Sequence, residues 1–493
     1  DSSQTAKVAR NSVAPIILNL FNRGIDFVFA IVMYRLISQE MVGVYNFAVV
    51  VFVWFDIFTN FGLDLFLMRE VSKDKTRSGF YLFNTSFFRF FLSVVGLGLL
   101  LVFMVFWQNT VEPLPQEGLI AIILLYIGLF PASLNKGMTS LYYAHEQAEK
   151  PAAIATITTI NKAIFGVIVL LLGYGIVGLA GVSIINNFIT LGVLLWAGRD
   201  FIDGLPKKPD MSLLKEMVSE SYPLMLNHFL ATIFFQIDIV ILQAIKGSIT
   251  VAQYSTSYKW LMAINIVPSF FTQALFPMMS RQAEEDKDRL KLTYQFGIKL
   301  MVALSLPVAV GFTVLAELLT LILAGASYVE NGSIALMIMI WSIPLGWMNS
   351  LTQYALIALG LQRYITRAFF LAVTFNIVAN IIFIPIYGFA AAAVTTILSE
   401  AALLIPFGIL MHRGLEQPVN WLSLIWRPVI ATGAMLAVVA VLLNVNMILA
   451  LIVASVVYLV VLLMLNPLDE NERAILSPML PERVRKLPFL KVA

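Results

Sequence analysis

Long apolar segments recur along the whole chain, and each is bounded by charged residues, proline or glycine. About 20 apolar residues in a helix are enough to cross the hydrocarbon core of a bilayer. A helix also satisfies its backbone polar groups internally, as a membrane crossing requires. We therefore predict an all-α polytopic membrane protein with about fourteen transmembrane helices, placed at 12–36, 42–67, 80–106, 119–143, 152–172, 176–198, 217–243, 251–279, 292–316, 333–359, 366–386, 388–411, 427–445 and 447–466.

The Lys and Arg residues are distributed unevenly between the two ends of these segments. Of the 32, 24 fall in alternate connections and at the termini, whereas the intervening connections hold only Arg35 and Lys246. Cytoplasmic loops of membrane proteins carry the excess of Lys and Arg. The pattern therefore predicts that both termini are cytoplasmic. Six basic residues lie inside the apolar segments, namely Arg23, Arg89, Lys136, Lys162, Lys259 and Lys299.

Composition excludes several other classes of function. Hydrophobic residues make up 60% of the chain and charged residues only 12%, whereas soluble domains contain about 25% charged residues. This excludes a water-soluble enzyme. The chain has no cysteine, and its net charge of +3 gives no indication of nucleic-acid binding. His145-Glu146 lacks the second histidine of a zinc motif, and no phosphate-binding glycine loop occurs. We expect no metal site, no cofactor and no enzymatic activity.

Three short patterns occur twice, with offsets of 208, 209 and 213 residues. PxxLNxF at 15–21 returns at 223–229, VGVY at 42–45 returns as VAQY at 251–254, and Tyr-Gly at 174–175 returns at 387–388. Because each half holds six spans, the repeat is parallel, and transporters built in this way bind substrate between the halves.

The repeat predicts two pseudo-symmetric six-helix lobes and two additional C-terminal helices. The N-terminal lobe would cover 1–198 and the C-terminal lobe 217–411. A cytoplasmic linker rich in proline and charge, 199–216, would connect them. Spans 13 and 14 fall in 412–466, and 467–493 would form a cytoplasmic tail.

The end of the second span carries a motif. Asp56 is followed by Asn60-Phe61-Gly62-Leu63 and then by Met68-Arg69-Glu70. Shorter patterns occur at 43–46, 174–178 and 276–280. In these residues and in the order of spans, the chain resembles the Wzx-type polysaccharide flippases of the multidrug/oligosaccharidyl-lipid/polysaccharide (MOP) transporter superfamily.

This resemblance implies a central cavity lined by spans 1, 2, 7 and 8 and transport by alternating access. The implied substrate is an undecaprenyl-pyrophosphate-linked oligosaccharide, moved from the cytoplasmic to the outer leaflet of a bacterial or archaeal plasma membrane. Membrane lipids and a polymerase or ligase of the same polysaccharide pathway are the implied partners. A proton or sodium gradient, or the membrane potential, would drive the transport.

Polar residues inside the first span share one face of the predicted helix. Asn19, Asn22, Arg23 and Asp26 follow the helical spacing i, i+3, i+4 and i+7. A charged side chain at the centre of a membrane helix costs about 2.5–3.5 kcal/mol and is functional by default. We favour a cavity site that binds a pyrophosphate. The alternative is an Arg23–Asp26 pair that only stabilises a helix contact.

Polar side chains in three further spans complete the candidate cavity. They are Asp56 and Asn60 in span 2, Asn227 in span 7, and Tyr254, Tyr258, Lys259 and Asn265 in span 8. Tyrosine faces can stack on sugar rings, and Lys259 can meet a phosphate; the alternative is an aromatic belt with a snorkelling lysine.

Candidate residues for ion coupling are Asp26, His228 and Asp238, although Asp238 is also compatible with a solvated position near the outer surface. Asp64, four residues beyond Asn60, continues the span 2 stripe and is placed to pair with Arg69. Pairing within a lobe is at least as plausible as substrate contact for Arg89, Lys136, Lys162 and Lys299. Glu400 in span 12 has no evident partner.

Two other functions stay open at this point. A MATE-like exporter of organic cations would use a cavity dominated by carboxylates and twelve spans. A membrane glycosyltransferase or polymerase would need a large outer loop, and the outer connections 107–118 and 317–332 are short.

Overall fold

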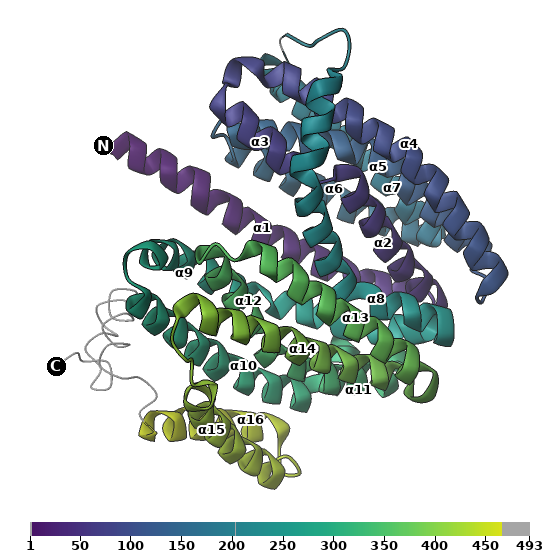
Figure 1. Ribbon diagram of the computed structural model, residues 1–493. Coiled ribbons are helices and arrows are strands. Elements are labelled where there is room, and N and C mark those ends of the chain that lie inside the picture. Colours follow the sequence, from purple (N-terminus) through teal and green to yellow (C-terminus); the bar gives the residue numbers. More distant parts are fainter. Residues whose placement is uncertain (1, 203, 466–493) are drawn as a thin grey trace. The chain divides into compact units, whose positions relative to one another are not determined.

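The computed structural model describes residues 2–202 and 204–465, with side chains from Pro15 onward. Within these residues, every long element is an α-helix, as the sequence predicted. The predicted tail 467–493 lies outside them. The α-helices (Figure 1) are α1 (Ser2–Leu36), α2 (Gln39–Asn60), α3 (Leu63–Lys73), α4 (Ser78–Thr110), α5 (Gln116–Ala144), α6 (Glu149–Leu171), α7 (Gly175–Ala197), α8 (Met211–Ile264), α9 (Ile266–Glu285), α10 (Lys287–Ala324), α11 (Val329–Met339), α12 (Ile343–Ala358), α13 (Gln362–Tyr387), α14 (Phe389–Leu415), α15 (Trp421–Leu442) and α16 (Met447–Met464).

The fold is that of a polytopic membrane protein. Thirteen helical segments of the described residues are long and apolar enough to cross a bilayer. One of them, Met211–Glu285, has 75 residues. At a rise of 1.5 Å per residue it would be about 110 Å long, far more than the roughly 30 Å of a bilayer core. Gly247 interrupts it with φ 77° and ψ 177°, so two helices meet there within α8. A residue with a Cβ rarely adopts this conformation.

The second predicted span is not one continuous helix. α2 ends at Asn60, and α3 begins at Leu63. Phe61 and Gly62 between them both have left-handed backbone conformations, with φ of 53° and 76°. The single helix predicted over 42–67 is therefore wrong, and so is the continuous polar stripe from Asp56 to Asp64. The break also allows close packing, because a Cβ on Gly62 would lie 3.0 Å from Leu224 Cβ on α8.

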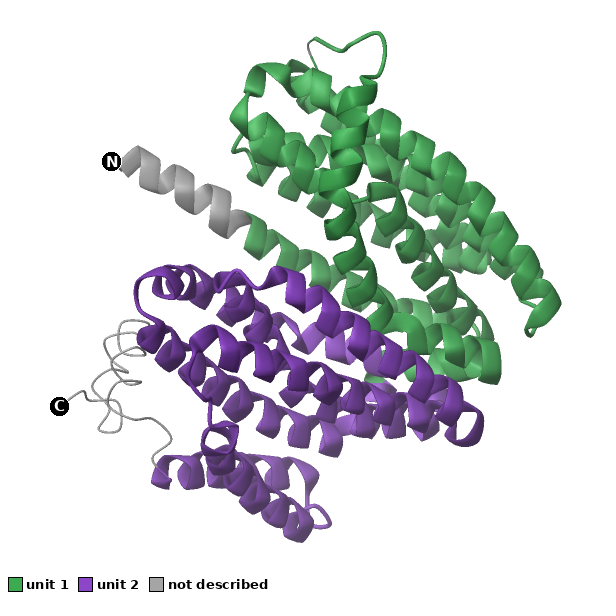
Figure 2. Ribbon diagram, in the orientation of Figure 1, with its two compact units in different colours: residues 1–255, 322–325 green, residues 256–321, 326–493 purple. Residues whose placement is uncertain are grey.

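The described helices form two compact units, coloured separately in Figure 2. Unit 1 comprises 1–255 and 322–325, and unit 2 comprises 256–321 and 326–493. The boundary between Ser255 and Thr256 falls inside α8 rather than in a loop. The predicted lobes 1–198 and 217–411 and the linker 199–216 stay a prediction.

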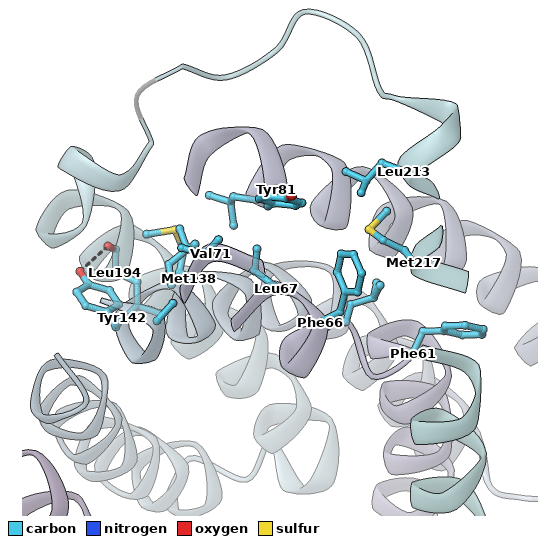
Figure 3. Packing of buried hydrophobic residues seen from close by; sticks show 14 of the residues in the cluster. Phe61, Phe66, Leu67, Val71, Tyr81, Met138, Tyr142, Leu194, Leu213 and Met217 are labelled. Atoms are coloured by element: carbon cyan, nitrogen blue, oxygen red, sulfur yellow. Dashed lines mark hydrogen bonds between the residues drawn. The ribbon is translucent and has the colours of Figure 1, made fainter. Parts of the chain in front are cut away.

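In unit 1, α3 lies within a hydrophobic cluster that draws on several helices (Figure 3). Leu67 and Val71 of α3 are fully buried together with Tyr142 of α5. Met217, near the start of α8, is fully buried in the same cluster. The Tyr142 hydroxyl donates a hydrogen bond to the Leu194 carbonyl of α7, 3.1 Å away. The beginning of α8 thus belongs to the core of unit 1.

In unit 2, α13 packs along α14 and α15 along α16. Met435 of α15 and Tyr458 of α16 are buried against Val310 of α10. The Tyr458 hydroxyl also donates to the Ala303 carbonyl, 2.7 Å away. The repeated Tyr-Gly pattern has the same local role twice, since Gly175 and Gly388 stand at the α6–α7 and α13–α14 junctions, and both have positive φ.

Candidate functional site

The polar stripe predicted on the first span is present on α1. Asn19, Arg23 and Asp26 are exposed, and Asn22 is buried with its Oδ1 lacking a hydrogen-bond partner. Within the described residues, neither Arg23 nor Asp26 forms an ion pair or a hydrogen bond. The alternative of a self-satisfied Arg23–Asp26 pair is therefore not realised in this structure. The Arg23 guanidinium lies exposed within the crossing segment Pro15–Leu36.

The opposite side of α1 is apolar. Together with α6 it forms a groove of about 950 Å³, lined by Phe21, Gly24 and Val28 of α1 and by Ile164 and Val167 of α6. Lipid acyl chains fill an open apolar groove in a bilayer without any specific recognition. The chemically informative face of α1 is therefore the polar one.

Two predicted residues of unit 1 form an ion pair. Lys136 Nζ of α5 lies 2.5 Å from Asp56 Oδ2 of α2. The Lys136 side chain is 36% exposed and that of Asp56 19%. Asp56, which was predicted to line the cavity, is thus compensated by a cation of its own unit. For Lys136, the structure shows a partner within the same unit, which is one of the two possibilities that the sequence left open.

Arg89 lies at the centre of the same unit. Its side chain is fully buried in α4, and its Nη2 donates to Asn60 Oδ1 of α2 at 3.2 Å. Its Nε and Nη1 have no partner among the described residues. Gly137 of α5 provides the space, because a Cβ there would lie 2.7 Å from Nη1. The Asn60–Arg89 hydrogen bond and the Asp56–Lys136 pair therefore connect α2 to α4 and to α5 through polar side chains.

The polar residues of α8 are arranged differently from what the pattern suggested. Asp238 is only 2% exposed, and its Oδ2 accepts a hydrogen bond of 2.5 Å from the Tyr254 hydroxyl. The alternative of a solvated Asp238 is wrong for this structure. Tyr254 is fully buried, so its ring faces are covered here. His228 is exposed and Asn227 half-buried.

The remaining predicted positions are spread over several helices. In unit 2, Tyr258, Lys259 and Lys299 are half-buried and have contacts of their own. Asn265 accepts a hydrogen bond of 3.0 Å from the indole nitrogen of Trp347. Lys162 of α6, in unit 1, is exposed. The structure brings Asp56, Asn60, Arg89 and Lys136 together, as well as Asp238 and Tyr254, and it leaves Lys162 apart from these networks.

The sequence missed the partner of Glu400. This glutamate of α14 is 5% exposed, and its Oε2 accepts a hydrogen bond of 2.7 Å from Asn349 Nδ2 of α12. Ser399, which directly precedes Glu400, is also buried, and its Oγ accepts a hydrogen bond of 2.9 Å from Nδ2 of buried Asn376. Asparagines inside the apolar spans 10 and 11 were a signal that could have identified this network, because amides are seldom buried without a partner.

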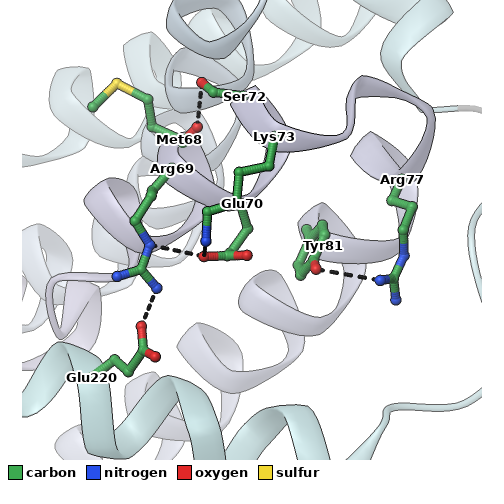
Figure 4. Close-up of polar contacts among 8 residues, drawn as sticks. All are labelled: Met68, Arg69, Glu70, Ser72, Lys73, Arg77, Tyr81 and Glu220. Atoms are coloured by element: carbon green, nitrogen blue, oxygen red, sulfur yellow. Dashed lines mark hydrogen bonds and ion pairs between the residues drawn. The ribbon is translucent and has the colours of Figure 1, made fainter.

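At the predicted cytoplasmic end of unit 1, the Arg69-Glu70 motif ties α3 to α8 (Figure 4). Arg69 Nε lies 2.8 Å from Glu70 Oε1, and its guanidinium also pairs with Glu220 of α8. Lys73 Nζ contacts the same Glu70 oxygen at 2.7 Å. The predicted Asp64–Arg69 pair is therefore replaced by two glutamate partners.

A histidine lies just beyond the membrane-crossing segment of α5. His145 Nε2 is 2.9 Å from Ser78 Oγ, and its ring stacks on Phe201 with centroids 4.2 Å apart. Partial burial lowers the pKa of His145 below its usual value, and the nearby charge of Lys75 lowers it further. The neutral form of the His145 ring is therefore favoured.

Comparison with known families decides where the chain belongs. The sequence matches the polysaccharide biosynthesis protein family over residues 8–282, which is more than half of the chain. The chain is a member of the polysaccharide biosynthesis protein family. In this polysaccharide biosynthesis protein, the MatE family also matches residues 223–382. No curated protein matches the sequence.

Solved structures of transporters share the fold. The lipid II flippase MurJ in an inward closed conformation aligns with a TM-score of 0.68 and 13% identity, over 91% of this chain and 98% of that one. An inward-facing multidrug resistance MATE family transporter of the MOP superfamily gives 0.67 and 14%, over 83% and 99%. A MOP superfamily transporter from Pyrococcus furiosus gives 0.60 and 13%, over 83% and 96%.

These matches establish the class of this polysaccharide biosynthesis protein. The chain belongs to the polysaccharide biosynthesis protein family and shares its fold with solved transporters of the MOP superfamily, in agreement with the predicted resemblance. The first family match includes the α1 stripe, the Arg89 network and the Arg69 pairs, all within 8–282. Glu400 lies outside both matched ranges.

Proposed function

We propose that this transporter is a flippase for a lipid-linked oligosaccharide, moving its pyrophosphate headgroup from the cytoplasmic to the outer leaflet by alternating access. The observation that carries the proposal is Arg23, a cation that is exposed within a membrane-crossing helix and has no partner among the described residues. A guanidinium in that position costs about 2.5–3.5 kcal/mol on insertion scales. An anionic substrate passing along α1 would offset this cost, because guanidinium and phosphate groups form strong bidentate hydrogen bonds.

The same proposal includes the finer topology. The turn at Gly247 separates two crossings within Met211–Glu285, which makes fourteen spans in all. The uneven distribution of Lys and Arg supports cytoplasmic termini. Two six-span lobes followed by spans 13 and 14 then give the arrangement that the internal repeat predicts.

The test is flipping of a defined lipid-pyrophosphate oligosaccharide in proteoliposomes. Arg23→Ala and Lys259→Ala should each slow flipping by roughly 10- to 100-fold, since a hydrogen bond to a charged group contributes about 1.5–3 kcal/mol. Lys162→Ala is the matched control, because Lys162 is also exposed within a span but lies in span 5, outside the spans 1, 2, 7 and 8 that would line the cavity. Wild-type rates in both Arg23→Ala and Lys259→Ala would exclude the cation route.

A MATE-like exporter is the second candidate, and one observation favours it. The MatE family matches residues 223–382, and the Asp26 carboxylate is exposed on the same face of α1 as Arg23. An organic cation would be drawn to Asp26 rather than to Arg23. Ethidium efflux that Asp26→Asn abolishes and Arg23→Ala preserves would support the exporter over the flippase.

A further inference from the structure

Glu400 is a buried carboxyl group that the route along α1 does not use. It lies near the middle of α14, and only 5% of the residue is exposed. An ionised carboxylate in an apolar interior is costly unless a cation or a metal ion compensates it, and otherwise the group takes up a proton. The neighbours of Glu400 therefore decide its charge.

Those neighbours are neutral. Asn349 Nδ2 of α12 donates to Glu400 Oε2 at 2.7 Å and to the Glu400 backbone carbonyl at 2.8 Å. On α13, Asn376 Nδ2 donates to Ser399 Oγ at 2.9 Å, and Asn380 Nδ2 donates to Asn376 Oδ1 at 2.8 Å. The buried polar groups around this part of α14 are thus amides and a hydroxyl.

No charged group pairs with Glu400 in the part of the chain that the structure describes. The helices α11, α12 and α13 and the short helix Ile340–Ser342 pack on α14, and Gly408 of α14 also faces Trp421 of α15. α12 and Ile340–Ser342 have no charged residue, and the charged residue of α15 is Arg427, which has a contact of its own. Apart from Glu400, the charged and titratable residues of α11, α13 and α14 are all exposed near helix ends, namely Glu330, Arg363, Tyr364, Arg367, Tyr387, His412 and Arg413. None of them forms an ion pair with Glu400, whose one polar side-chain partner in the described part of the chain is Asn349.

Glu400 is also not part of a cluster of metal-binding side chains. No group of three or more His, Cys, Asp or Glu side chains comes together among the described residues. Gly346 of α12 faces Glu400 Oε1 so closely that a Cβ on it would lie 3.2 Å from that oxygen. A proton needs only one basic atom and no additional space.

We propose that Glu400 is a proton-binding site of unit 2 and that its proton couples to transport. In the conformation described, the carboxyl group is neutral. Protonation forms one O–H bond at Oε1, since Oε2 already accepts the Asn349 hydrogen bond, and the proton comes from water. Release returns the proton to water and leaves a carboxylate. The binding site stands on geometry alone, whereas the coupling role rests on the proposed transport function.

Infrared spectroscopy of the full chain in lipid nanodiscs tests the binding site without any substrate. At neutral pH the wild type should show the carbonyl band of a protonated carboxylic acid. Glu400→Gln should lose it, and Glu330→Gln, which changes an exposed glutamate of the same unit, should retain it. Asn349→Leu should shift the band, because the hydrogen bond to Oε2 is removed. A wild-type spectrum without this band, or a band that survives Glu400→Gln, overturns the proposal.

A sodium control and a transport assay complete the test. Replacing choline chloride by sodium chloride in the buffer should leave the carbonyl band of protonated Glu400 unchanged. Loss of this band in sodium would assign the site to a metal cation and overturn the proposal. In proteoliposomes, a pH gradient should change the flipping rate of wild type but not of Glu400→Gln. If the band is found and flipping responds equally in both, the coupling role is wrong and proton binding stands. If wild type flips no lipid-linked glycan, the proposed function fails while the infrared result still decides the site.

Discussion

In unit 1 the partly buried Asp56 carboxylate pairs with Lys136, whereas in unit 2 the buried Glu400 carboxyl group lies beside neutral amides. In unit 1, Lys136 compensates Asp56, and the charges of Asp64 and Asp56 act on buried Arg89. In unit 2, Glu400 has Asn349 and no cation among the described residues. The comparison indicates two different uses of buried polarity. A compensated network keeps its charges and holds helices together, while an uncompensated carboxyl group changes its charge by exchanging a proton.

The largest expected effect comes from removing the buried cation of unit 1. Arg89→Met removes the hydrogen-bond donor of Asn60 Oδ1 and the positive charge on which Asp64 and Asp56 act. Removing one partner of a buried charge network costs about 3–5 kcal/mol. Thermal unfolding in detergent micelles measures this loss. Lys162→Met, at an exposed position of α6, should stay within about 0.5 kcal/mol of wild type. A stable Arg89→Met protein would show that the carboxylates of unit 1 need no buried cation.

A smaller effect should separate the Asp56–Lys136 pair from ordinary surface pairs. Because these side chains are partly buried and 2.5 Å apart, a double-mutant cycle with Asp56→Asn and Lys136→Met should give a coupling energy of about 1 kcal/mol. The same cycle on Arg199 and Asp200, which are 79% and 90% exposed, should give a value near zero. Equal coupling in both cycles would contradict the view that unit 1 depends on internal charge compensation.

The smallest effect concerns pH. Burial and the charge of Lys75 lower the pKa of His145 in the folded protein, so the unfolded chain binds more protons below its usual pKa of about 6.5. The stability that neutral His145 contributes is complete above that pH and is lost as the pH falls from 6.5 toward the lowered value. His145→Gln should flatten this part of a plot of melting temperature against pH. A variant with the same pH slope as wild type would exclude His145 as its source.

The helices and the family could be predicted from the sequence because both depend on local patterns. Apolar runs identified the crossings, although several helices extend past the predicted ends, as α4 (Ser78–Thr110) does beyond 80–106. The break after Asn60 was missed, because nothing in the local pattern indicates that Phe61 adopts a positive φ.

The partners of the site residues could not be predicted in the same way. Lys136 and Asp56 are 80 residues apart, and Asn349 and Glu400 are 51 apart. Helix periodicity places residues on a face, but it does not identify the helix that this face contacts. The sequence placed six basic residues inside the apolar segments but could not tell their environments apart. Only the structure shows that Arg23 is exposed, that Arg89 is buried and that Lys136 forms an ion pair.

The turn at Gly247 has a mechanical consequence. A single residue joins the two helices of α8, and the second helix continues through the boundary between the units at Ser255 and Thr256 without a loop. Position 248 is also locked onto α2, since a Cβ on Gly43 would lie 1.8 Å from the Ser248 carbonyl oxygen. A helix resists twisting far more than a loop does. Any rotation of the helix that begins after Gly247 therefore acts directly on its close contact with the start of α2, within unit 1.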